Sequence, residues 1–203
     1  VLAWTLRSLL AHPRVDCIRC VIHPDDRDLY DAAAPADPRV LAPVPGGASR
    51  QVSVRLGLEA LAAAAPDIVL IHDGVRPFVS LQLVDRLLAG VKAADGVIPA
   101  LPVTDTVKRV DSDGRVTETV ARDGLWTVQT PQAFRFPALL DAHRRAAMDE
   151  PDRFTDDASI AEWAGLAVAT VPGDKMNRKL TTAADIAEAG ALLSPAAPPP
   201  SEI

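Results

Sequence analysis

A carboxylate and a guanidinium three residues apart form the first pattern in this sequence that could perform chemistry. They are Asp73 and Arg76, which follow a short apolar run, residues 68–71, within the stretch DIVLIHDGVRP. Such a run is typical of a strand that is buried on both faces, as in a parallel sheet. Ligands of open α/β sheets bind at the carboxyl ends of the strands, so the pair is placed for a metal ion and a phosphate. The alternative is that Asp73 accepts hydrogen bonds from turn amides and Arg76 pairs with a surface acid.

A pair of glycines between a strand and a helix forms the second pattern. Gly46 and Gly47 precede a clearly helical segment, residues 52–65. Glycines there let backbone N–H groups approach a ligand closely at the positive end of the helix. Arg50 and Ser53 lie in the first turn of that helix. The alternative is a solvated charge at Arg50 and a helix-end hydroxyl at Ser53.

The elements that must position these residues alternate between apolar strands and helices, which is typical of an α/β domain with a mostly parallel sheet. Residues 108–120 differ, because they alternate apolar and polar side chains around Asp113-Gly114, which predicts a β-hairpin. A lone hairpin cannot bury itself, so we expect this arm to pack on a second subunit. The expected strands are 18–22, 39–44, 68–71, 96–103 and 166–171; the expected helices are 1–10, 27–33, 52–65, 81–94, 136–148, 155–164 and one that begins near 182.

The overall composition limits the class of protein. The length of 203 residues fits one domain, which we place at residues 1–193, with a proline-rich tail or linker at 194–203. The formal net charge of −6 argues against a nucleic-acid partner, and no run approaches the roughly 18 apolar residues of a membrane span. Cys17 and Cys20 lack a second ligand pair, which predicts ordinary strand cysteines and a cytoplasmic location.

Seven motifs follow one another in order and cover nearly the whole chain. They are Gly46-Gly47-x-x-Arg50-x-x-Ser53-Val54, His72-Asp73-x-x-Arg76-Pro77, Pro102-Val103-x-Asp105-Thr106-x-Lys108, Arg122-x-Gly124-Leu125-Trp126, Thr130-Pro131-Gln132, Thr155-Asp156-x-Ala158-Ser159 and Asn177-x-Lys179. Together they resemble the 2-C-methyl-D-erythritol 4-phosphate cytidylyltransferase (IspD) family. The resemblance implies a Rossmann-like nucleotidyltransferase that dimerises through a protruding hairpin arm at about residues 105–122. It also implies transfer of a cytidylyl group from CTP to methylerythritol phosphate, with release of pyrophosphate.

The same resemblance implies roles for particular residues around the nucleotide. Gly47 and Ser53 would hold the cytidine, with Gly46 and Arg50 nearby. Arg76 would help to hold the nucleotide.

Further roles concern the metal ion and the second substrate. Asp73 would bind Mg²⁺ on the triphosphate, and Lys179 would act at the reacting phosphates. Thr106 and Arg122 would hold the methylerythritol phosphate from the partner subunit. The acids at 156 and 157 are interpreted as helix caps rather than ligands.

The reaction requires these residue types. Its nucleophile is a phosphate oxygen, already ionised at neutral pH because its second pKa is about 6, so no general base is needed. What remains is alignment and charge neutralisation. Mg²⁺ is held by one or two carboxylates plus phosphate oxygens, so Asp73 can suffice. Arginine suits bidentate phosphate binding and lysine a point charge at the reacting centre.

The family's amino-terminal strand and its basic nucleotide loop would precede Val1, which predicts that this sequence is incomplete at its beginning. The proline-rich tail suits a linker to the cyclodiphosphate synthase to which some family members are fused. Three alternatives remain: a ribitol-5-phosphate cytidylyltransferase on the same fold, a non-catalytic dimeric remnant that does not bind CTP·Mg²⁺, and a dinucleotide oxidoreductase. The last is disfavoured because no G-x-G-x-x-G follows a strand.

Overall fold

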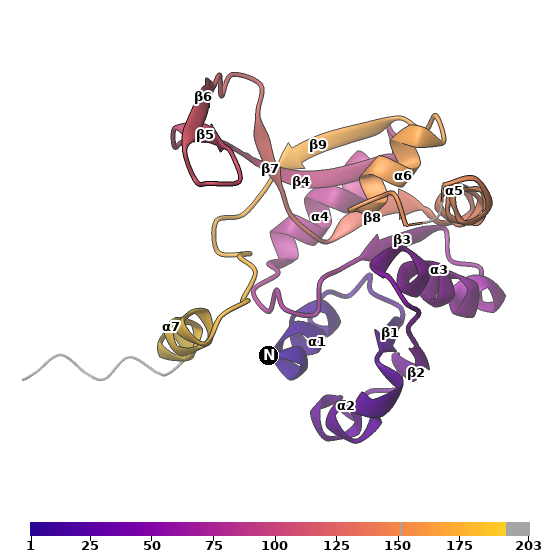
Figure 1. Ribbon diagram of the computed structural model, residues 1–203. Helices are drawn as coiled ribbons and strands as arrows, with labels where there is room; N and C mark the ends of the chain where they lie inside the picture. Colours follow the sequence, from indigo (N-terminus) through magenta and orange to yellow (C-terminus); the bar gives the residue numbers. More distant parts are fainter. Residues whose placement is uncertain (151, 194–203) are drawn as a thin grey trace, which may run out of the picture.

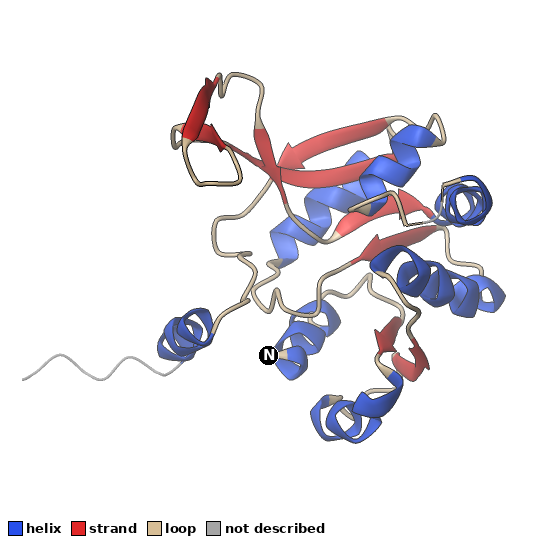
Figure 2. Cartoon of the chain, viewed as in Figure 1, coloured by secondary structure: helices blue, strands red, loops and turns tan. Residues whose placement is uncertain are grey.

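The centre of the protein is a five-stranded sheet, shown in Figures 1 and 2 as a computed structural model that describes residues 1–150 and 152–193. Strand β4 lies at its middle and pairs along one edge, in parallel, with β9. Strands β7 and β8 follow one another along the opposite edge of β4, both antiparallel, and β8 continues to β3 on its other side. The strands are β3 (Ile68–Ile71), β4 (Gly96–Pro102), β7 (Trp126–Val128), β8 (Gln132–Arg135) and β9 (Val168–Pro172).

The α/β class is confirmed, and the sheet is more mixed than the apolar runs predict. Strands β3, β4 and β9 share one direction, as expected for a mostly parallel sheet, whereas β7 and β8 run against them. Strand β8 has only four residues and was not predicted. Because β8 lies between β3 and β4, it brings the segment that precedes it to the carboxyl end of β3.

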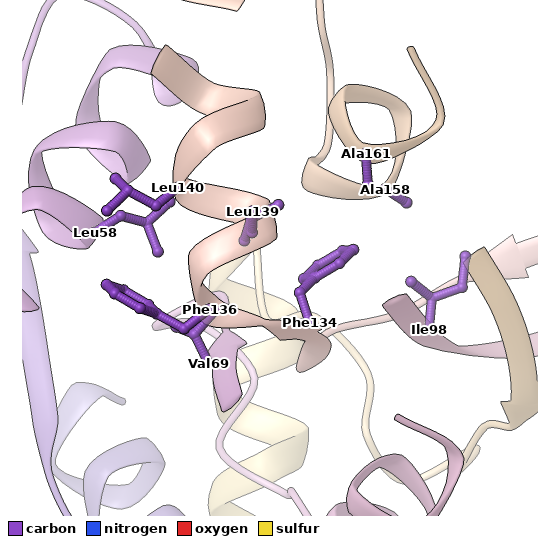
Figure 3. Packing of buried hydrophobic residues seen from close by; sticks show 9 residues of the cluster. All are labelled: Leu58, Val69, Ile98, Phe134, Phe136, Leu139, Leu140, Ala158 and Ala161. Carbon is purple, nitrogen blue, oxygen red and sulfur yellow. The ribbon is translucent and has the colours of Figure 1, made fainter. Parts of the chain in front are cut away.

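Helices cover both faces of the sheet. Alternate side chains of a strand point to opposite faces, so Phe134 of β8 packs on one face and Ala133 on the other. The Phe134 face is covered by α3 (Arg50–Leu61), α5 (Phe136–Asp149) and α6 (Asp157–Trp163), with the packing drawn in Figure 3. The opposite face is covered by α4 (Leu81–Gly90) and α1 (Leu2–Leu10).

A second, smaller sheet pairs β1 (Ile18–Ile22) with β2 (Val40–Pro45) in parallel. Within residues 1–150 and 152–193, no strand pairing joins it to the five-stranded sheet. Its residues are half-buried at most, whereas β4 begins with five buried residues. The short helix η1 (Pro24–Asp26) and helix α2 (Arg27–Ala33) connect its strands, and η2 (Ala62–Ala64) follows α3.

The predicted hairpin is confirmed. Strands β5 (Val107–Val110) and β6 (Val116–Val120) pair antiparallel and stand apart from the five-stranded sheet in Figure 1. The turn contains Gly114, whose φ of 79° is a conformation that favours glycine. The arm is therefore available to meet another surface.

The predicted helices are also present, with shifted ends. The last one is α7 (Ala183–Leu193), and it begins with the reciprocal bonds of a capping box. The backbone N–H of Thr182 donates to Asp185 Oδ2 at 2.8 Å, and the N–H of Asp185 donates to Thr182 Oγ1 at 3.2 Å. The proline-rich segment 194–203 lies outside the described residues.

Candidate active site

One carboxylate oxygen at the end of β3 gathers two cations from different parts of the chain. Asp73 Oδ2 lies 3.3 Å from Arg76 Nε and 3.4 Å from Lys179 Nζ. Arg76 is further fixed by a 2.8 Å hydrogen bond from Nη1 to the carbonyl oxygen of Asn177. Three residues predicted from the sequence thus form one cluster. Lys179 is 47% exposed, so its ammonium can be reached from solvent.

The loop that carries Asp73 is braced from two sides. Helix α1 provides the hydroxyl of Thr5, which donates to the carbonyl oxygen of Gly74 at 2.8 Å. Ser8 donates to the carbonyl oxygen of Pro77 at 2.6 Å. From the other side, the N–H of Leu180 donates to the carbonyl oxygen of Val75 at 2.9 Å. The backbone that follows Asp73 is therefore fixed by hydrogen bonds at Gly74, Val75 and Pro77.

His72 and Thr130 lie directly beneath the cluster. His72 Nε2 is 3.0 Å from the carbonyl oxygen of Arg76, and its Nδ1 is 3.0 Å from Thr130 Oγ1. The backbone N–H of Asp73 donates to the same Thr130 Oγ1 at 3.0 Å. Burial lowers the pKa of His72 to about 4, so its ring is neutral at physiological pH.

The glycine pair adjoins a cavity of about 200 Å³ at the start of α3. The N–H of Gly47 donates to Ser53 Oγ at 3.1 Å, which closes the loop onto the helix. A Cβ at Gly47 would lie 2.2 Å from Val52 Cγ1, so only glycine fits this backbone path. The cavity is lined by Val21, Ile22, His23, Pro24, Gly46, Gly47 and Ser53. Gly46, Gly47 and Ser53 are therefore brought together as predicted.

Arg50, at the first position of α3, makes an ion pair with the buried Asp157 that was not predicted. Its Nη2 lies 2.6 Å from Asp157 Oδ2, and the other oxygen of Asp157 is 3.1 Å from His143 Nε2. The prediction that Asp157 caps a helix is wrong: Asp156 caps α6 by accepting from Ser159 N, while Asp157 is fully buried. Capping needs a side chain that folds back to its own helix end, and Asp157 instead points to α3 and α5.

The surrounding charges favour the ionised forms of both Asp157 and Arg50. Burial alone would raise the pKa of Asp157, but the hydrogen bond from His143 and the charge of Arg50 outweigh it and lower that pKa. Burial opposes the charge of Arg50, yet Asp157, Asp73 and Asp156 together raise its pKa. The contribution of Asp73 means that Arg50 lies within electrostatic reach of the cluster at the end of β3.

Thr106 and Arg122, the residues expected at the second substrate, are exposed on the arm. The guanidinium of Arg122 donates to the carbonyl oxygen of Thr104, and Lys108 donates to Thr119 Oγ1 at 2.6 Å. Across the described residues, no hydrogen bond or ion pair joins Thr106 or Arg122 to Asp73. One chain therefore does not assemble the whole predicted set.

The donor set at Asp73 fits a magnesium ion that is mainly held by phosphates. The shortest approach of each cation to Asp73 is to Oδ2, at 3.3 Å from Arg76 and 3.4 Å from Lys179. The residues 1–150 and 152–193 contain no group of three or more His, Cys, Asp or Glu that could hold a metal by themselves. One carboxylate can hold Mg²⁺ when a nucleotide supplies the other ligands.

Two further observations concern the whole described part of the chain. None of the helices within 1–150 and 152–193 is long and apolar enough to cross a membrane. Cys17 and Cys20 are both free thiols.

A mixed α/β sheet with this cluster at a strand end, together with a glycine pair before a helix, is the arrangement expected of a nucleotidyltransferase. The sequence agrees: the model of the family "IspD: 2-C-methyl-D-erythritol 4-phosphate cytidylyltransferase" matches residues 1–195. The chain therefore belongs to the 2-C-methyl-D-erythritol 4-phosphate cytidylyltransferase family.

Known relatives and structures agree with this assignment. A bifunctional enzyme IspD/IspF of Nitrobacter winogradskyi is 50% identical over 196 residues, which are 97% of this chain and 49% of that protein. The one from Rhodospirillum rubrum is 52% identical over 189 residues, 93% of this chain and 48% of that protein. The chain thus spans about half the length of these curated relatives.

Among solved structures, the 4-diphosphocytidyl-2C-methyl-D-erythritol synthase of Anaerococcus prevotii superposes with a TM-score of 0.83 at 34% identity. The match covers 95% of this chain and 88% of that one. The 2-C-methyl-D-erythritol 4-phosphate cytidylyltransferase of Thermus thermophilus has a TM-score of 0.78 at 33% identity, covering 94% and 87% of the two chains.

Proposed function

We propose that this domain transfers a cytidylyl group from CTP to 2-C-methyl-D-erythritol 4-phosphate, with release of pyrophosphate. The observation that carries the proposal is the cluster of Asp73, Arg76 and Lys179 at the end of β3, in a chain of this family. Two cations around one carboxylate suit a polyphosphate substrate.

The chemistry needs charge neutralisation rather than proton transfer. An oxygen of the methylerythritol phosphate attacks the α-phosphorus of CTP, and the bond from that phosphorus to the pyrophosphate oxygen breaks. The attacking oxygen is already ionised, since its second pKa is about 6. Lys179 and Arg76 would stabilise the charge that spreads over the reacting phosphates. Mg²⁺, when bound at Asp73, supplies further neutralisation of the triphosphate.

The glycine loop would hold the nucleotide. The backbone at Gly46 and Gly47 carries no side chain that could keep a base or ribose away, and Ser53 Oγ holds this loop at 3.1 Å from Gly47 N. Arg50 adds positive charge at the helix start, where the backbone dipole also favours an anion.

We also propose that the protein is a homodimer through its arm, and that Thr106 and Arg122 serve the partner's site. A set of exposed apolar side chains on and beside the arm supports this arrangement, because apolar side chains that gather on a surface often mark an interface. It consists of Val110, Val116, Leu125, Trp126 and Val128.

The reaction is tested by measuring pyrophosphate release from CTP and Mg²⁺, with methylerythritol 4-phosphate or ribitol 5-phosphate as the acceptor. The sample is this chain, in parallel with a chain that carries the upstream and downstream coding sequence. We expect release with methylerythritol 4-phosphate. Preference for ribitol 5-phosphate would favour the related cytidylyltransferase. Dimerisation without CTP binding in both samples would favour the non-catalytic remnant.

The wider context of the domain is proposed from its relatives. Several of them are named bifunctional enzyme IspD/IspF, which supports a fusion to the cyclodiphosphate synthase through the proline-rich segment 194–203. A transcript with no such downstream domain would contradict it. We propose a cytoplasmic location, supported by the two free cysteines and testable by cell fractionation.

A further inference from the structure

We propose that Thr130 is the positioning residue of this site, and that it sets the orientation of the metal-binding loop through a one-way chain of hydrogen bonds with the ring of His72. The proposal deepens the proposed function, since it concerns the same Asp73. Thr130 is only 7% exposed and lies between β7 and β8, next to the loop that follows β3.

The direction of each hydrogen bond follows from which atoms can donate. The backbone N–H of Asp73 can only donate, so Thr130 Oγ1 accepts this bond at 3.0 Å. The hydroxyl proton of Thr130 is then free to be donated to His72 Nδ1, 3.0 Å away. That bond requires a bare Nδ1 with its lone pair available.

The hydrogen bond at Nε2, on the other side of the His72 ring, independently indicates where the ring carries its hydrogen. His72 Nε2 lies 3.0 Å from the carbonyl oxygen of Arg76, which can only accept. Nε2 must therefore carry the hydrogen. Among the neutral forms of the ring, only the tautomer with its hydrogen on Nε2 satisfies both bonds.

The chain of bonds closes around residues 72–76. It starts at the N–H of Asp73, passes through Thr130 and His72, and ends at the carbonyl of Arg76. The main chains of Asp73 and Arg76 are thus held by bonds that do not use the side chains of either residue. Removal of the Thr130 hydroxyl would leave two buried polar groups, Asp73 N–H and His72 Nδ1, without their partner, which is unfavourable.

The main chain of Thr130 holds the second cationic segment. Its carbonyl oxygen accepts a 2.8 Å hydrogen bond from Asn177 Nδ2, and Asn177 is fully buried. The carbonyl of Asn177 in turn accepts from Arg76 at 2.8 Å, and Lys179 follows two residues later. One residue therefore aligns all three members of the cluster.

The first test observes the His72 ring directly by ¹⁵N NMR and does not depend on activity. The chain has four histidines, and the His72→Gln variant identifies the signals of this ring. We expect the protein to show hydrogen on Nε2 and an accepting Nδ1. A ring with its hydrogen on Nδ1 would overturn the proposal without any further variant.

The second test compares Thr130→Val, which keeps the shape and removes the hydroxyl, with Thr130→Ser, which restores it. We expect the Nδ1 signal to move in the valine variant and to return in the serine variant. The control is Thr5→Val, which removes a buried hydroxyl bonded to Gly74 in the same loop. It should leave the His72 signals in place. Unchanged ring signals in Thr130→Val would overturn the proposal.

Kinetics supply the link to function. Because small misplacements of a reacting group cost up to about 10²-fold in rate, we expect kcat of Thr130→Val to fall about 10- to 100-fold while the KM for CTP changes less than about threefold. Thr130→Ser should stay within about threefold of the wild type in both. If the wild type does not turn over, the proposed reaction fails, whereas the ring spectra still decide the role of Thr130.

Discussion

Lys179 and Arg76 share one oxygen of Asp73, and this arrangement sets what each residue can do. Arg76 is nearly buried and is also bonded to Asn177, so it is a fixed charge. Lys179 is half exposed and is held by the ion pair. It is therefore the residue that can follow the phosphates as the reaction proceeds.

Replacement of Lys179 by methionine should lower kcat by about 10²–10³-fold, the usual effect of removing one group that stabilises developing charge. Steady-state pyrophosphate release measures it. The matched control is Lys175→Met, an exposed lysine four residues earlier, which should leave kcat within about twofold. Equal losses in both variants would show that the effect is general positive charge rather than Lys179.

The buried ion pair of Asp157 should make stability depend on acid pH. Its pKa is lower in the folded protein than the ordinary value of 3.8, so its stabilisation is complete above that value. The stabilisation is lost as the pH falls through the lowered folded-state pKa. Denaturant unfolding between pH 2 and 6 should therefore show this loss in the wild type and a flatter profile in Asp157→Asn.

The same variant should be less stable at pH 7 by about 1–3 kcal/mol, because the buried position loses its charged contacts with His143 and Arg50. Arg50 is partly exposed and can turn to water, which limits the loss. Asp149→Asn is the control, since this acid is exposed near the end of α5. A wild-type profile unchanged by Asp157→Asn would refute the assignment.

For single residues, the sequence predicted which ones are functional better than it predicted their ion-pair and hydrogen-bond partners. Asp73 and Arg76 were recognised because they follow an apolar strand, and Lys179 because its motif resembles that of the family. Asp157 was interpreted as a cap because its partner Arg50 lies 107 positions away in the chain, beyond any local pattern. Thr130 belonged to the motif Thr130-Pro131-Gln132, but no role was predicted for it, since its role depends on which atoms surround it.

The glycine loop before α3 leaves no room for a side chain at Gly47. A Cβ at Gly47 would overlap Val52 Cγ1 at 2.2 Å, so Gly47→Ala must displace the loop. We expect the Kd for CTP to rise at least about tenfold, equivalent to ~1.4 kcal/mol, measured by calorimetry. Gly47→Ala combined with Val52→Ala should recover part of the affinity, because the smaller side chain makes room.

The control for this pair is Gly190→Ala in α7, where an added Cβ would lie more than 4 Å from every other element among the described residues. CTP affinity should be unchanged there. Tight CTP binding by Gly47→Ala would mean that the loop does not hold the nucleotide.

Strands and helices with clear periodicity were predictable from the sequence, and the order of strands in the sheet was not. The run at β3 and the Asp-Gly hairpin were found because burial and turn geometry leave local patterns. Strand β8 has the sequence QAFR, which is too short to show a period. Its antiparallel place between β3 and β4 arises only from packing.

At the scale of the whole molecule, the proposed dimer predicts complementation between inactive variants. Arg122→Ala would damage the partner's site and Lys179→Met its own site. A heterodimer would then hold one intact and one doubly damaged site. Random exchange of subunits should restore about a quarter of the wild-type sites, since half of the dimers are mixed.

Pyrophosphate release before and after mixing measures this recovery. Mixing Lys179→Met with Asp73→Asn is the control, because both defects lie in the same chain's site and no intact site can form. Absence of recovery with Arg122→Ala would place Arg122 in the site of its own chain.

The arm and the catalytic cluster also share one stretch of main chain. Strand β7 ends at Val128, Gln129 donates to the carbonyl oxygen of Asp174 at 2.8 Å, and the next residue is Thr130. A second subunit that packs on Trp126 would therefore contact the chain four residues before Thr130, which orients Asp73. We expect dimerisation to fix the position of Thr130. Dilution to monomers should then change the ¹⁵N signals of the His72 ring before any substrate is present.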